Sequence, residues 1–110
     1  MENLRTLKTN QTILENGKTT KFFSYNTLIA EIRTNKQNDN LYFTNYWDYS
    51  KTTTKYLYQF LNEYKNQISN NIYTKILSAL NSANKKASFK NLIDNKIIKL
   101  IYNIKNRIEK

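Results

Sequence analysis

The spacing of apolar residues changes near Ser50, and this change constrains the fold more than any other feature of the chain. Before Ser50, the short runs TLIAEIR (27–33) and LYFT (41–44) are rich in β-branched and aromatic residues, and Leu28, Ala30 and Ile32 recur with a period of two, which is typical of β-strands. After it, apolar residues recur every three or four positions, as in amphipathic helices. The sequence therefore predicts an α+β fold, with strands first and helices after them.

A hairpin is predicted around the single glycine of the chain. Asn16 and Gly17 separate two β-prone runs, 12–14 and 18–24. Asn-Gly between such runs favours a type I′ turn, because both central residues of that turn need positive φ.

Together with 27–33 and 41–44, these runs predict an antiparallel sheet of about four strands. In 27–33, Glu31 and Arg33 are expected to point outward. The residues of the same run expected to face the core are Leu28, Ala30 and Ile32. Residues 1–10 have a weaker pattern, which fits either a short extra strand or a helix.

About three helices are expected after the sheet. The first covers 51–65 and the second runs from Ile68 to Leu80. The third is capped by Ser88 and extends to Ile108. Its apolar stripe is Phe89, Leu92, Ile93, Ile97, Leu100, Ile101, Ile104 and Ile108. This stripe either covers the sheet and the second helix, or forms the seam of a homodimer.

The composition limits the chemistry that the chain can perform. We expect a single domain over 1–110, with the sheet and first helix in 1–65 and a basic helical part in 66–110. The chain has neither cysteine nor histidine, which removes the commonest thiolate and imidazole ligands, and its carboxylates are scattered. We therefore expect no metal, no cofactor, no catalytic residues and no enzymatic activity. No run is long enough to span a membrane, so a cytoplasmic protein without a membrane partner is expected.

Positive charge gathers at the C-terminal end. The chain has a net charge of +10, a balance that AT-rich coding also favours through lysine, so the distribution is the better guide. Residues 85–110 hold eight basic and two acidic residues, which is a net charge of +6. Such a surface favours a polyanion such as nucleic acid or a nucleoprotein. The residues expected to bind phosphates are Lys85, Lys86, Lys90, Lys96, Lys99, Lys105 and Arg107.

A second candidate region is the segment NYWDYSKTTTKY, residues 45–56. Ser50 is the expected N-cap of the first helix, with Asp48 as the alternative. The free N–H groups there could also bind one phosphate, but no glycine-rich loop precedes them, so nucleotide hydrolysis is not expected. The residues left around this cap as a binding rim are Tyr46, Tyr49, Lys51 and Lys55.

The tyrosines leave two uses open. Exposed tyrosines beside lysines stack the bases of single-stranded nucleic acids. They also supply rigid contact area in protein interfaces.

Residues 24–61 resemble a family of small uncharacterised proteins of phages and mobile elements. The shared motif runs from a Ser-Tyr-x-Thr strand to a Trp-x-x-Ser-x-Thr-Thr helix start. The matching residues are Ser24, Tyr25, Thr27, Ile29, Ala30, Thr44, Trp47, Ser50, Thr52, Thr53 and Lys55. The family motif often continues with histidine where this chain has Tyr56, so chemistry that needs this histidine does not carry over. The resemblance implies a mobile-element accessory protein in a bacterial host.

The sequence thus predicts a non-enzymatic accessory protein that binds nucleic acid or a nucleoprotein through its basic helical surface. The alternative is an anti-CRISPR-like inhibitor that binds a host protein, such as a defence nuclease.

Overall fold

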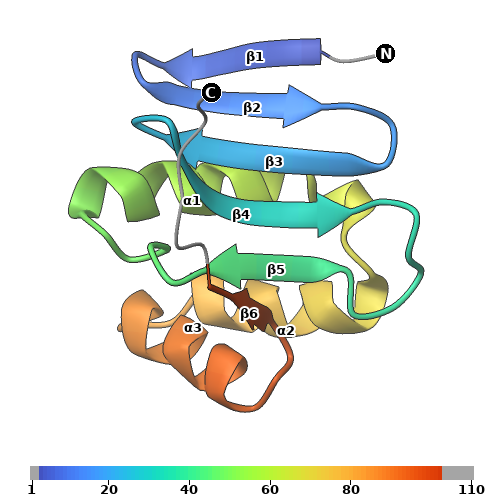
Figure 1. Cartoon of the computed structure of the whole chain (residues 1–110). Helices are drawn as coiled ribbons and strands as arrows, with labels where there is room; N and C mark the ends of the chain where they lie inside the picture. Colours follow the sequence, from blue (N-terminus) through green and yellow to red (C-terminus); the bar gives the residue numbers. More distant parts are fainter. Residues whose placement is uncertain (1–2, 103–110) are drawn as a thin grey trace.

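The fold is built around one six-stranded sheet in which the strands lie in chain order, β1-β2-β3-β4-β5-β6. The computed structural model describes residues 3–102, and Figure 1 shows the sheet with its helices. The first five strands pair antiparallel, whereas β6 pairs parallel to β5. The strands are β1 (Asn3–Lys8), β2 (Gln11–Glu15), β3 (Thr19–Ser24), β4 (Thr27–Arg33), β5 (Leu41–Thr44) and β6 (Lys99–Ile101). The α+β class is confirmed, with six strands instead of about four.

The hairpin around the glycine forms, but its turn differs from the prediction. The central residues are Gly17 and Lys18, and the N–H of Asn16 donates to the Thr19 carbonyl at 3.1 Å. Gly17 has φ +87°, but Lys18, the second central residue, is not among the residues of positive φ, so the turn is not type I′. The Asn16 side chain instead accepts the Thr19 N–H at 2.8 Å. This bond favours asparagine at position 16, immediately before the two central residues of the turn.

A β-bulge in β4 changes which residues face the core. The register places Phe22 opposite Ala30 and Phe23 opposite Leu28, so β4 has one extra residue between these pairs. Such a residue shifts the alternation of faces, and Ile29 joins Ala30 in the core with 0% exposure. Ala30 and Ile32 were predicted correctly, but Leu28 lies outside the core cluster and is only partly buried.

The helices lie on one face of the sheet. They are α1 (Lys51–Glu63), the 3₁₀ helix η1 (Lys65–Gln67), α2 (Asn70–Leu80) and α3 (Lys85–Asp94). Figure 1 shows α1 and α2 behind the sheet and α3 beside β6 at its lower edge. Aromatic rings join the layers, since Phe22 stacks on Phe60 at 5.6 Å and Phe43 on Phe89 at 6.0 Å.

The predicted long third helix is wrong. Helix α3 begins after Asn84, whose side chain accepts the Ala87 N–H, and ends at Asp94. The apolar residues that follow do not continue the helix but form β6, which pairs with the open edge of β5. The homodimer seam, which was the alternative reading of the apolar stripe from Phe89 to Ile108, therefore has no continuous helix to form on, and positions 103–108 lie outside the described residues.

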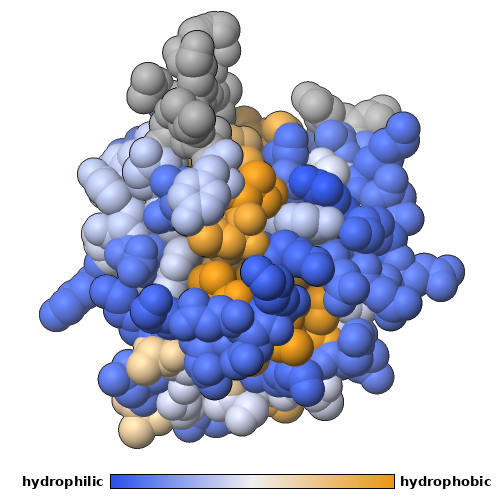
Figure 2. All heavy atoms as spheres, turned by 60° about the horizontal axis from the view of Figure 1, so that its bottom comes forward, coloured by the Kyte–Doolittle hydropathy of each residue, from blue (hydrophilic) through white to orange (hydrophobic). Residues whose placement is uncertain are grey.

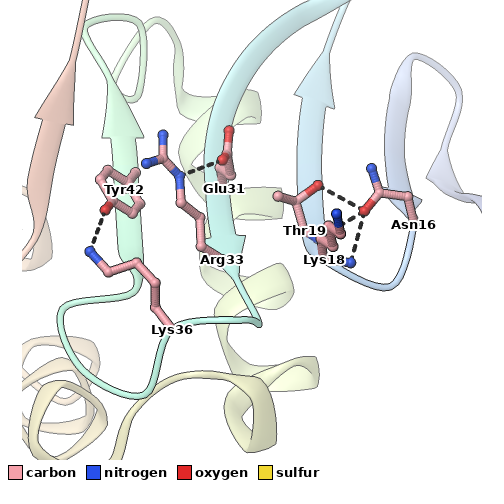
Figure 3. A network of polar contacts seen from close by, with 7 residues as sticks. All are labelled: Asn16, Lys18, Thr19, Glu31, Arg33, Lys36 and Tyr42. Carbon is pink, nitrogen blue, oxygen red and sulfur yellow. Dashed lines mark hydrogen bonds and ion pairs between the residues drawn. The ribbon is translucent and has the colours of Figure 1, made fainter.

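The opposite face of the sheet holds a polar network instead of exposed tyrosines (Figure 3). Arg33 places its guanidinium 3.8 Å above the Tyr42 ring and donates to Glu31 at 2.7 Å, and Lys36 donates to the Tyr42 hydroxyl at 3.0 Å. Tyr42 is therefore only 9% exposed and Glu31 8%. Glu31 points away from the helices as predicted, but it is not a surface charge.

None of the described helices has the length and apolarity needed to cross a bilayer.

Candidate nucleic-acid interface

One groove on the helical side brings the two predicted binding regions together. We call it the lysine groove. It is formed by three segments: residues 45–54 before and in α1, residues 86–94 of α3, and residues 96–102 in and around β6. Three adjoining depressions make it up, with Asp48 lining two of them and Asp94 two. The lysines that line it are Lys51, Lys86, Lys90, Lys96 and Lys99.

The first wall of the groove is the start of α1, which Ser50 caps as predicted. The Thr53 N–H donates to Ser50 Oγ at 3.1 Å, and Thr53 itself is fully buried against Ser24, with 3.0 Å between the hydroxyls. This bonding fixes the first turn on β3, so Tyr49 and Lys51 stay outside the core. Tyr49 is 68% exposed.

The second wall is α3, whose lysines face both aspartates. Lys86 Nζ lies 3.6 Å from a carboxylate oxygen of Asp48, and Lys90 Nζ lies 3.9 Å from one of Asp94. All four side chains are more than one-third exposed, so each ion pair contributes little to stability. Phe89, fully buried between Phe43 and Tyr58, fixes the helix in this position.

The third wall begins where α3 stops. The Ile97 N–H donates to the Leu92 carbonyl at 2.9 Å and the Lys96 N–H to the Ile93 carbonyl at 3.0 Å. This is the Schellman pattern, in which the residue after the C-cap takes a left-handed conformation. Here that residue is Lys96, with φ +63°, so the chain turns sharply into β6.

An apolar band lies along the same side of the molecule. Figure 2 brings the lower side of Figure 1 forward and shows hydrophobic residues in a band with hydrophilic residues on both sides. The apolar residues that line the groove include Ile93, Ile98 and Leu100. Leu100 is 37% exposed, and Tyr102 beside it is 71% exposed. The groove thus combines lysines with an apolar, aromatic surface.

The predicted binding residues fall into four groups. Those lining the groove are Lys51, Lys86, Lys90, Lys96, Lys99 and Tyr49. Lys85 and Lys55 are exposed but do not line it, and Lys55 lies 5.3 Å from the centre of the Tyr56 ring. Tyr46 is partly buried and packs against the core. Lys105 and Arg107 lie outside the described residues.

Sequence reasoning missed most of the groove residues that are not basic. Asp48 was predicted as an alternative helix cap and Leu100 as part of an apolar helical stripe, and neither Asp94 nor Tyr102 was predicted to bind a partner. An exposed tyrosine closely following a basic segment was the available signal for Tyr102. The two aspartates gave no signal, because their place depends on how α3 packs.

Tyr58 is an ionisable group near the groove whose pKa is shifted. Burial raises the pKa of Tyr58, and the negative charge of Asp48 raises it further, so this hydroxyl stays neutral. Within residues 3–102, no three acidic side chains come together in a way that could hold a metal ion.

Comparison with known proteins identifies only a family. No curated protein and no solved structure matches the chain. A family model described as a family of unknown function, DUF8033, matches residues 1–78. The match ends inside α2, so α3 and β6 lie beyond the matched residues. Because it covers more than half of the sequence, the chain belongs to the DUF8033 family.

Proposed function

We propose that this chain is a non-enzymatic accessory protein of a phage or mobile element that binds nucleic acid, free or in a nucleoprotein, in the cytoplasm of a bacterial host. The observation that carries the proposal is the convergence of five lysines from three separate segments around one groove. Of these, Lys51, Lys96 and Lys99 make no ion pair with any residue of the described chain. Unpaired lysines on a surface favour a polyanion, because they neutralise its phosphates and release the cations bound to it.

The helix starts support the same partner. Lys51 is the first residue of α1, and Lys85 and Lys86 are the first two of α3, while neither first turn contains an acidic residue. Lysine is unfavourable there, because the N-terminus of a helix already has a partial positive charge. A bound phosphate would offset this repulsion.

Lys96 is a further unfavourable choice that a binding role explains. Its left-handed conformation suits glycine best, yet the chain has lysine there, next to Lys99 in the groove. A lysine at a strained backbone position is consistent with direct contact to a ligand.

Salt dependence is the test of this proposal. Binding to a labelled oligonucleotide, measured by fluorescence anisotropy, should weaken steeply as salt rises. Replacing Lys96 and Lys99 together by glutamine should lower the slope of log K against log salt by about 1–2, since each lost phosphate contact removes about 0.7–0.9. Lys18→Gln, in the β2–β3 turn away from the groove, should leave the slope unchanged. A slope near zero for the unaltered protein would refute the proposal.

A second function has a specific observation in its favour. The exposed Tyr49, Tyr102 and Leu100 form the kind of aromatic and apolar surface that protein interfaces use. We therefore keep as the alternative an inhibitor that binds a host defence nuclease. A tagged protein should then retain one host protein in fixed ratio after the lysate is treated with nuclease, and a Tyr102→Asp variant should lose it. Loss of all bound material on nuclease treatment would favour the first function.

A further inference from the structure

We infer that the nucleic acid held in the lysine groove is a single strand whose bases face the apolar floor and whose phosphates follow the lysines. This inference rests on the proposed function and specifies its ligand. Single-stranded DNA and RNA share the chemistry concerned, which is a flexible chain of phosphates with unpaired bases.

The shape of the site argues against a duplex. A helix that reads the major groove must project from the protein, whereas α3 forms one wall of a groove. Its N-terminal half lies against Asp48 through Lys86, and its C-terminal end turns back into β6. A flexible single strand can enter such a groove, whereas a stiff duplex meets mainly its rim.

The aromatic residues supply surfaces for unpaired bases. Tyr49 lies at the α1 end of the groove and Tyr102 in the part formed with β6, and Leu100 lies beside Tyr102. Both tyrosines are about 70% exposed, at 68% and 71%. A base needs a free ring face for stacking, and in a duplex the base faces are already occupied by neighbouring bases.

The two aspartates indicate which part of the strand faces the middle of the groove. Asp48 and Asp94 both line the middle depression and are paired with Lys86 and Lys90, so a phosphate is attracted less there than by the unpaired lysines on either side. The amino groups of cytosine, adenine and guanine are instead donors that carboxylates accept. The charge pattern therefore favours bases toward the aspartates, and phosphates toward Lys51, Lys96 and Lys99.

Strand preference is measured with probes of one sequence. Fluorescence anisotropy in low salt compares labelled DNA and RNA single strands with their duplexes. A length of about 16 nucleotides is the upper site size of a single OB-fold domain that binds single strands. At least one single strand should bind about tenfold more tightly than its duplex. Whichever of the DNA and RNA strands binds more tightly is the kind of nucleic acid that the groove prefers.

Substitutions of the tyrosines test the stacking contacts. Tyr102→Leu and Tyr49→Leu should each weaken single-strand binding by about fivefold or more, because leucine has no flat ring for a base. Tyr102→Phe keeps the ring and should retain affinity. Tyr25→Leu removes another exposed tyrosine, in the β3–β4 turn and 52% exposed, and should leave the affinity unchanged. Circular dichroism establishes that each variant is folded.

The outcomes separate this inference from the proposed function. Equal or tighter duplex binding, or unchanged affinity in both leucine variants, would overturn the single-strand inference and leave nucleic-acid binding in place. Failure to bind any of the probes in low salt would overturn both.

Discussion

Gln11 is a buried amide that no neighbour satisfies. It lies opposite Ser24 in the β2–β3 register, is 1% exposed, and neither its Oε1 nor its Nε2 has a hydrogen-bond partner in the described chain. An unpaired buried amide reduces stability by about 1–3 kcal/mol. Gln11→Met keeps the length of the side chain and removes both polar atoms. It should raise the free energy of unfolding, measured with urea, by a similar amount.

Gln67 is the matched control for Gln11, because its amide is bonded. Thr20, which is 2% exposed, donates its hydroxyl to Gln67 Oε1 at 2.6 Å. Gln67→Met leaves that hydroxyl without its acceptor, so this substitution should destabilise the protein. Stabilisation by both substitutions, or by neither, would contradict the assignment of Gln11 as an unsatisfied group.

Lys96 lines the groove and has a left-handed backbone, so its substitution affects both binding and stability. Lys96→Gly should raise the free energy of unfolding by about 0.5–1 kcal/mol relative to Lys96→Ala, since only glycine relieves the left-handed conformation. Both variants lose the same charge, so they should lose equal affinity for an oligonucleotide. If alanine is as stable as glycine in urea unfolding, φ +63° is not a source of strain.

Helices α1 and α2 both follow a serine, but only one of these serines caps its helix. Ser50 accepts the Thr53 N–H, whereas Ser69 makes no side-chain cap bond and its buried Oγ has no partner in the described chain. Ser50→Ala should therefore cost about 1 kcal/mol, whereas Ser69→Ala, which removes a buried hydroxyl without a partner, should be neutral or stabilising. Thermal unfolding of the two variants checks this, and equal losses would contradict it.

Local signals explain which elements could be predicted. The hairpin at Gly17, the strands β4 and β5, and the apolar face of α1 each depend on neighbouring residues, and these elements formed where they were predicted, although the turn type and the core-facing residues of β4 differed. Helix α3 ends because Lys96 takes a left-handed conformation. The sequence has no glycine there that would indicate this end. Strand β6 depends on an open edge of β5 far away in the chain, and the residues of β6 fit a helical stripe equally well. Periodicity alone could not decide between them.

Arg5 joins the first strand to the helical layer and makes stability depend on pH. Its guanidinium forms an ion pair with Glu63 and donates to the Tyr64 hydroxyl at 3.2 Å, and this hydroxyl donates to Glu15 at 3.0 Å. The hydrogen bond from Gln59, followed by those from Arg5, lowers the pKa of Glu63 below its usual value of 4.5. The stabilisation from Glu63 is therefore present above that value and is lost as the pH falls through the lowered pKa.

Glu63→Gln tests this linkage. The unaltered protein should lose more stability than the variant between about pH 5 and pH 3, by less than about 1 kcal/mol, because the pair is partly exposed to solvent. Urea unfolding across this range gives the difference. Parallel pH profiles for the two proteins would show that Glu63 does not have the lowered pKa.

The groove could be predicted only in part. Its lysines and Tyr49 were identified from charge and exposure, because a basic run and a helix start are visible in the sequence. That these two regions meet follows from the packing of Phe89 between Phe43 and Tyr58, which is a long-range contact. For the same reason Asp48 and Asp94 gave no indication of a shared site.

The parallel strand has a consequence for the order of events during folding. Each antiparallel neighbour among the first five strands follows directly in the chain, but β6 joins residues 99–101 to residues 42–44. Contacts between distant residues close late, because a long loop must be ordered first. Until then, β5 has an unpaired edge to which another chain can add a strand. The arrival of β6 therefore ends the interval in which a newly made chain is most exposed to aggregation, and assembles the binding groove in the same step.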